Sequence, residues 1–171
     1  FAESSNHIKI SEHAFGKCSS LKSLNIPKSV FSIEKYAFKD CLRIQTLIIN
    51  AEFDCIECGT FSGCSSLVDV VIPPTVKEIK SSAFDNCASL SSIKLPKELK
   101  MIGQFAFSEC YSLKMIIIPE SVEEIGEYSF KKCSALKILQ FENESKNKKI
   151  KIDDSCFFGC SSLKLNKKNF S

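Results

Sequence analysis

Residues 83–102 read AFDNCASLSSIKLPKELKMI, and the same pattern of apolar positions recurs along the chain. The recurrence is easiest to follow in the phenylalanines, which fall 23 residues apart at Phe15, Phe38, Phe61, Phe84, Phe107 and Phe130. A cysteine comes three residues after each of them, and a further pair, Phe157 and Cys160, follows after a step of 27 residues. A constant period of this length is typical of a solenoid, in which each repeat forms one coil that stacks on the next.

Other apolar columns keep the same period. The column three residues after the cysteine contains Leu21, Ile44, Leu67, Leu90, Leu113, Leu136 and Leu163. Two more apolar positions follow, Leu24 and Ile26 in the first repeat, and their spacing of two predicts a strand with both side chains on one face. Proline comes next at Pro27, Pro73, Pro96 and Pro119. Because proline has no N–H to donate, it is expected to end the strand and turn the chain.

A second extended run is predicted after each proline, for example at residues 76–79. The segment around each phenylalanine and cysteine is too short for more than a helical or 3-10 turn. No single repeat can bury its apolar side chains alone, so we expect the coils to stack about 4.8 Å apart into a parallel sheet.

We therefore predict one solenoid domain over residues 1–171, with about seven coils. The incomplete first repeat and the abrupt end at residues 169–171 predict a fragment of a longer protein. An uncapped end would expose the stacked side chains and is expected to favour end-to-end self-association.

Ten cysteines in one chain first suggest a disulfide framework. Seven of them, however, occupy a single column of the repeat: Cys18, Cys41, Cys64, Cys87, Cys110, Cys133 and Cys160. Parallel Cβ directions in such a column give poor disulfide geometry, so we expect buried free thiols that act as small apolar side chains. Cys156 stands where other repeats have alanine and is expected to be buried too.

Cys55 and Cys58 form a CxxC pair outside the column. A redox CxxC uses a helix N-terminus to lower the pKa of its first thiol, and no helix is predicted here. A zinc site would need a second pair of ligands, and no histidine or cysteine has that spacing. Two interpretations stay open, a local disulfide and two partly exposed thiols, and neither a metal nor a cofactor is expected.

The full pattern, A-F-x-x-C-x-x-L-x-x-I-x-I-P-x-x-V-x-x-I, resembles the BspA-like leucine-rich repeats over about residues 10–163. The resemblance implies a leucine-rich repeat solenoid of the α/β class, rich in strand, with its parallel sheet on a concave face. The chain departs from the pattern where Asn50 and Glu142 replace proline and where residues 143–149 add four residues, for which we predict a loop. The family occurs on the surfaces of bacteria and protozoan parasites and is associated with adhesion to host matrix proteins and cells.

Binding in such a solenoid is expected on the outer side of the strands of the concave face. The candidate protein-binding residues there are Ile48, Val71, Lys94, Met115, Ile117 and Ile138. Exposed apolar groups of this kind often mark contact surfaces. The alternative is that β-branched residues are there because they suit strands, and that scattered exposed apolar side chains are ordinary.

Other classes of function find little support. The two histidines, His7 and His13, lie in the irregular first repeat, away from any nucleophile with a third group to orient it. The 23 basic and 20 acidic residues are spread evenly, which disfavours a nucleic-acid surface, and no apolar run is long enough to insert in a membrane. The lysines Lys146, Lys148, Lys149 and Lys151 are interpreted as a solvated loop, and residues 143–145 match a glycosylation acceptor pattern.

The sequence thus favours a non-catalytic protein-binding domain, part of a cell-surface or secreted adhesin that contacts host matrix or cell-surface proteins. The alternatives are a cytoplasmic interaction scaffold, which the free thiols would suit, and a structural spacer.

Overall fold

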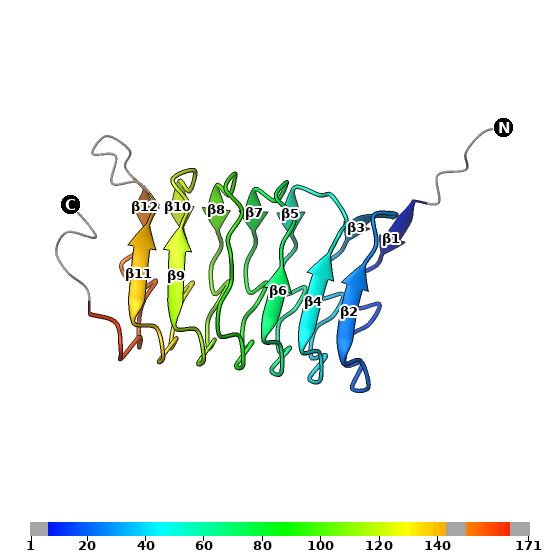
Figure 1. The fold of residues 1–171 in the computed structure, drawn as a ribbon, viewed down its shortest axis with the longest axis horizontal. Helices are drawn as coiled ribbons and strands as arrows, with labels where there is room; N and C mark the ends of the chain where they lie inside the picture. The colour runs from blue at the N-terminus through cyan, green and yellow to red at the C-terminus, as the bar shows by residue number, and fades with distance from the viewer. Residues whose placement is uncertain (1–6, 143–149, 165–171) are drawn as a thin grey trace.

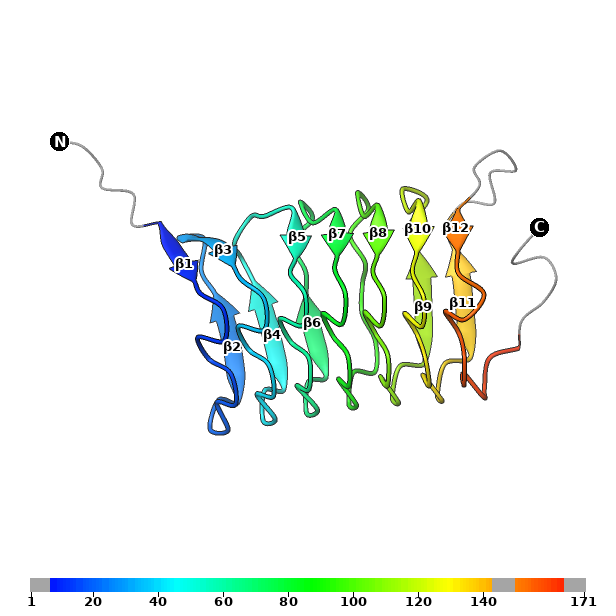
Figure 2. The same cartoon turned by 180° about the vertical axis from the view of Figure 1, so that it is seen from behind.

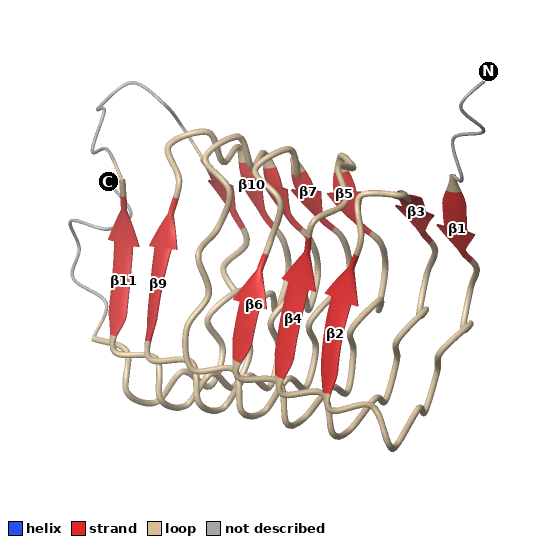
Figure 3. Cartoon of the chain, turned by 45° about the vertical axis from the view of Figure 1, so that its right-hand side comes forward, coloured by secondary structure: helices blue, strands red, loops and turns tan. Residues whose placement is uncertain are grey.

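The computed structural model describes residues 7–142 and 150–164, and these form a stack of coils (Figure 1). Most coils run through a longer strand, a corner, a shorter strand and a segment of tight turns. The longer and the shorter strands lie on opposite sides of the stack (Figures 1 and 3). We call these sides the long-strand face and the short-strand face.

The long-strand face is built from five strands, β2 (Ser23–Ile26), β4 (Thr46–Ile49), β6 (Asp69–Val71), β9 (Met115–Ile118) and β11 (Ile138–Phe141). They pair in parallel as two separate sheets, β2-β4-β6 and β9-β11. Between the two sheets, residues 92–95 of the intervening coil form no strand. The predicted parallel pairing is therefore present on this side, and it is divided into two parts.

The residue that follows each strand explains much of this interruption. A parallel ladder needs an N–H just after the second strand to bond the last carbonyl of the first. Asn50 and Glu142 supply it, donating to the carbonyls of Ile26 and Ile118 at 2.9 Å each. The strand pairs that end at these two residues keep four paired positions each. The pair that ends at Pro73 keeps three, and no strand is formed before Pro96.

The short-strand face holds a continuous sheet of five two-residue strands: β5 (Cys55–Ile56), β7 (Glu78–Ile79), β8 (Met101–Ile102), β10 (Glu124–Ile125) and β12 (Lys151–Ile152). Figure 2 shows them in sequence order from behind. Here the residue after each strand has an N–H, and Lys80, Gly103, Gly126 and Asp153 donate it to the preceding strand at 2.7–3.1 Å. Two further strands, β1 (Ile8–Ile10) and β3 (Val30–Ile33), pair separately with each other.

The segments around the phenylalanines are runs of tight turns, and none of the described residues is helical. The prediction of short helical or 3-10 turns is therefore wrong. In one coil, the N–H groups of Ala37 and Lys39 bond carbonyls three residues back, whereas that of Phe38 bonds Thr60 of the next coil at 2.9 Å.

A helix is excluded because two residues in most coils adopt the left-handed backbone region. They lie two positions before and after the phenylalanine, and in this coil they are Tyr36 and Asp40, each with φ of 58°. A left-handed non-glycine residue costs about 1–2 kcal/mol. The alternating pattern of local and inter-coil hydrogen bonds offsets that cost, because it gives successive backbone N–H groups a partner.

The core is a set of stacked columns between the two faces. Seven phenylalanine rings stack in one series from Phe15 to Phe157, with centroids 5.1–5.6 Å apart. The rings of Phe38, Phe61, Phe84, Phe107 and Phe130 are fully buried. Phe15 is 43% exposed, so the first ring contributes less to the core than its place in the pattern predicts.

The cysteine column has a polar role that the sequence analysis missed. Six of its seven thiols donate to the carbonyl of the phenylalanine in the preceding coil, as Cys87 does to Phe61 at 3.3 Å. The same contact, at 3.0–3.3 Å, is made by Cys41, Cys64, Cys110, Cys133 and Cys160. All ten cysteines are free thiols, as predicted for the column, and Cys156 is buried at the alanine position. Burial raises the pKa of the Cys64 thiol to about 12, so it stays protonated at neutral pH.

Candidate functional site

The candidate binding residues lie on the outer side of the long-strand face. Along β4, Leu47 and Ile49 point inward and are buried, whereas Thr46 and Ile48 are exposed. The same alternation in the other long strands exposes Val71, Met115 and Ile138, leaves Ile117 half-buried, and exposes Lys94 in the coil without a strand. The structure therefore places all six residues on one side of the stack.

Strand register joins the apolar members of this set into two groups. Ile48 lies directly beside Val71 in the β4–β6 pair, and the two are 42% and 56% exposed. Met115 lies beside Ile138 in the β9–β11 pair, with Ile117 two residues along β9. Lys94 belongs to the coil that separates the groups. We call these two groups together the apolar patches.

Exposed apolar side chains occur elsewhere too, at Leu42, Val68 and Tyr111 among others. These three lie outside the strands, Leu42 and Tyr111 in turns and Val68 directly before β6. What distinguishes the apolar patches is direct lateral pairing across a sheet. That a partner binds there stays a prediction.

The CxxC cysteines are two free, half-buried thiols, which is one of the two interpretations left open by the sequence. The Cys55 thiol donates to Glu57 at 3.4 Å, and Glu57 also accepts from Lys80 Nζ at 2.7 Å. Burial, followed by the hydrogen bond to Glu57, raises the pKa of Cys55. The environment therefore disfavours the thiolate that redox exchange requires.

The two histidines are engaged in ring contacts. His13 stacks on Tyr36 with centroids 5.1 Å apart, and His7 packs edge-on against Phe31 at 6.0 Å. Within residues 7–142 and 150–164, no group of three or more histidine, cysteine, aspartate or glutamate side chains is arranged to hold a metal ion. The predicted loop and the acceptor pattern at residues 143–145 lie outside the described residues, as do Lys146, Lys148 and Lys149.

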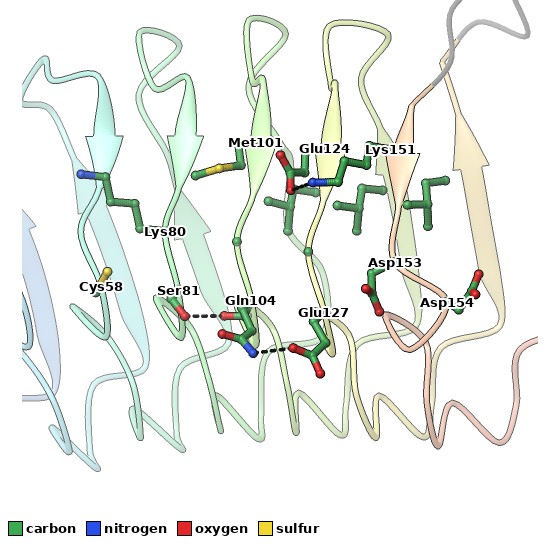
Figure 4. A pocket seen from close by; sticks show the side chains of 15 residues that line it. Cys58, Lys80, Ser81, Met101, Gln104, Glu124, Glu127, Lys151, Asp153 and Asp154 are labelled. Atoms are coloured by element: carbon green, nitrogen blue, oxygen red, sulfur yellow. Dashed lines mark hydrogen bonds and ion pairs between the residues drawn. The ribbon is translucent and has the colours of Figure 1, made fainter.

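The short-strand face also has a recess of about 660 Å³, which the sequence did not predict. Its lining comes from successive coils and includes Lys80, Gly103, Gly126 and Asp153 (Figure 4). The only signal in the sequence was a pair of glycines at the repeat spacing of 23 residues.

A search for membrane-spanning helices found none in the part of the chain that the structure describes.

Comparison with known proteins gives a consistent picture. The sequence model of the BspA type leucine rich repeat region matches residues 2–91 and 59–169, with six copies. No curated protein matched the chain.

Among solved structures, a leucine-rich repeat protein from Bacteroides ovatus is 31% identical, with a TM-score of 0.73 over 84% of this chain and 36% of its own. One from T. pallidum is 26% identical, with a TM-score of 0.72 over 84% of this chain and 78% of its own. A leucine rich cell surface protein from Faecalibacterium prausnitzii is 28% identical, with a TM-score of 0.64 over 80% of this chain and 43% of its own. The chain thus spans about a third of the first of these proteins and less than half of the third.

Proposed function

This chain belongs to the BspA-type leucine-rich repeat family, and on that basis we propose that it is a non-catalytic domain that binds other proteins. The binding surface is the outer side of the long-strand face. The observation that carries the proposal is the lateral pairing of Ile48 with Val71 and of Met115 with Ile138. Paired apolar side chains on neighbouring strands present a contiguous surface that a partner can cover.

The fuller proposal is that the domain is part of a cell-surface adhesin that contacts host matrix or cell-surface proteins. Its support is the likeness to the leucine rich cell surface protein from F. prausnitzii. Lys94 lies between the apolar patches and would add a charged contact at the centre of the interface.

A double substitution on the patches tests the proposal. Val71→Asp with Ile117→Asp places one carboxylate in each apolar patch, and the interface would have to bury both. Binding of the labelled chain to a surface coated with reconstituted basement-membrane extract is expected to fall to background. The thermal midpoint is expected to change little, because Val71 is exposed and Ile117 is half-buried.

The matched control is Leu42→Asp with Tyr111→Asp, which adds the same charge at exposed apolar positions away from the patches. This control is expected to bind as the unsubstituted chain does. Undiminished binding by the patch variant, or an equal loss in the control, would overturn the proposal.

A second candidate is an intracellular scaffold that uses the same face. The observation in its favour is that all ten cysteines are free thiols, as is usual in a reducing compartment. Antibody staining of intact and then permeabilised cells separates the candidates. Staining of intact cells supports the adhesin, and staining only after permeabilisation supports the scaffold.

A further inference from the structure

The recess on the short-strand face lies opposite the apolar patches. Figure 4 shows two rows of side chains with open space between them, Met101, Glu124 and Lys151 in one row and Ser81, Gln104 and Glu127 in the other. Each row takes one side chain from each of three successive coils. With about 4.8 Å per coil, the recess extends roughly 14 Å from Lys80 to Asp153, enough for about four extended residues.

Two stacked glycines open the space. Gly103 and Gly126 occupy the position that holds Glu57, Lys80 and Asp153 in other coils. A Cβ on Gly103 would lie 2.8 Å from the backbone of Lys80 and Ser81, and one on Gly126 would lie 2.9 Å from the Gln104 nitrogen. The coils approach closely here, so a side chain at either position would push the coils apart and fill the recess.

The charge along the recess is uneven. Lys80 at one end is paired with Glu57 at 2.7 Å, and Lys151 is paired with Glu124 at 2.9 Å. Near the other end lie three further carboxylates, those of Glu127, Asp153 and Asp154. Gln104 Nε2 donates to Glu127 at 2.8 Å, and Ser155 donates to Asp153, which lowers the pKa of Asp153. Among the described lining residues at this end, Lys151 forms its ion pair with Glu124 and also attracts Asp153, so the carboxylates outnumber the one cation.

We propose that this recess binds an arginine side chain presented by an extended segment of a partner protein. The planar guanidinium matches the carboxylates at the acidic end, where it can donate two parallel hydrogen bonds. The aliphatic stem of the arginine would lie along the half-buried Met101, which lines the recess. A cation of this kind fits better than a metal ion, since the carboxylates in the described part of the chain form no cluster suited to one.

The test uses two blocked pentapeptides that differ in a single charge, acetyl-Gly-Gly-Arg-Gly-Gly-amide and the same peptide with neutral citrulline in place of arginine. Each is titrated into the ¹⁵N-labelled chain at about 0.15 M salt, which screens non-specific attraction. The amide resonances of Gly103 and Gly126 are expected to shift with the arginine peptide, with an affinity several-fold higher than for the citrulline peptide. Equal affinities, or shifts confined to other residues, would overturn the proposal.

Two variants sharpen the result. Glu127→Gln with Asp154→Asn removes two charges at nearly constant shape and is expected to reduce the arginine peptide to the affinity of the citrulline peptide. Val71→Asp with Ile117→Asp leaves the recess intact and is expected to keep full peptide binding. Arginine binding in the recess and protein binding at the apolar patches can therefore be tested independently. Retained affinity for the arginine peptide in the Glu127→Gln, Asp154→Asn variant would contradict arginine binding in the recess.

Discussion

The long-strand and short-strand faces are built by the same coils, yet their sheets divide at different coils and the faces differ in chemistry. The longer strands are divided into two sheets and carry exposed apolar side chains. The two-residue strands β5, β7, β8, β10 and β12 form one unbroken sheet, flanked by ion pairs such as Lys80–Glu57 and Lys151–Glu124. Strand length therefore does not decide continuity, and the backbone donor after each strand has a large part in it.

Proline at the corner between a longer and a shorter strand affects the hydrogen bonds of both faces, and this explains why they divide at different coils. It withholds the N–H that would extend the long-strand ladder, but its carbonyl accepts a turn bond, as Pro73 does from Val76 at 3.2 Å. At Asn50 the ladder bond is made, while no corresponding bond joins Phe53 to Asn50, both of which the structure describes. The short-strand face divides at this coil, between β3 and β5.

The largest expected effect comes from the core that both faces share. Phe84 is fully buried between the rings of Phe61 and Phe107, so Phe84→Ala is expected to lower the free energy of unfolding by about 3–5 kcal/mol. Phe15→Ala is the matched control and is expected to cost only about 1–2 kcal/mol, because Phe15 is already 43% exposed. Chemical denaturation measures both. Equal costs, or an unchanged midpoint for Phe84→Ala, would show that the faces do not depend on the stacked rings.

An intermediate effect is expected from alkaline pH. The folded pKa of Cys64 is about 12, above the value of about 8.5 for an unfolded thiol. Between these values the unfolded chain has lost the proton and the folded chain keeps it, so stability is complete below about pH 8.5 and falls as the pH rises. From pH 9 to 11, Cys64 alone is expected to remove about 2.5 kcal/mol.

The measurement is urea denaturation at several pH values, with Cys64→Ala as the control. The variant is expected to be less stable at pH 7, and to lose less stability than the unsubstituted chain between pH 9 and 11. Parallel pH profiles for the two proteins would contradict the assignment of Cys64 as a protonated, buried donor to Phe38.

The smallest expected effect on stability comes from a substitution at the corner where the two faces differ in their hydrogen bonds. Asn50→Pro removes the bond to Ile26 and supplies the proline that other corners use. The lost hydrogen bond and the stiffer unfolded chain act in opposite directions, so the net change is expected to stay within about 1 kcal/mol. Hydrogen exchange is expected to show new protection at the Phe53 amide. If the Phe53 amide stayed unprotected, the proline carbonyl would not accept the turn bond proposed for this corner.

The repeat pattern was sufficient to predict the stacked coils, the buried columns and the free thiols, because each depends on residue type at a fixed period. The turns were predicted less well. Ten non-glycine residues adopt left-handed backbone in the part of the chain that the structure describes, which their types disfavour and which hydrogen bonds between coils sustain. Such tertiary support is not visible in one repeat. The thiol donors were missed for a similar reason, since the acceptor carbonyl lies in the preceding coil.

The apolar patches could be predicted because strand alternation alone separates Ile48 from Leu47 and Met115 from Ile116. Their separation into two groups could be predicted as well, because Lys94 stands between Val71 and Ile117 in the same column of the repeat. The recess was missed because a missing side chain is a weak signal. The role of Gly103 and Gly126 becomes clear only from the neighbouring coil, whose backbone would lie within 3 Å of an added Cβ.

The chain contains two methionines, one on each face, and they provide the most direct test of which face binds a partner. Met115 is 40% exposed in an apolar patch, and Met101 is half-buried beside the recess. The measurement is the rate of sulfoxide formation at each methionine in dilute peroxide, for the chain alone and bound to reconstituted basement-membrane extract. Oxidation of Met115 is expected to slow several-fold on binding, and any slowing at Met101 would report occupancy of the recess. Binding that leaves the oxidation rate of Met115 unchanged would contradict the assignment of the long-strand face as the protein-binding surface.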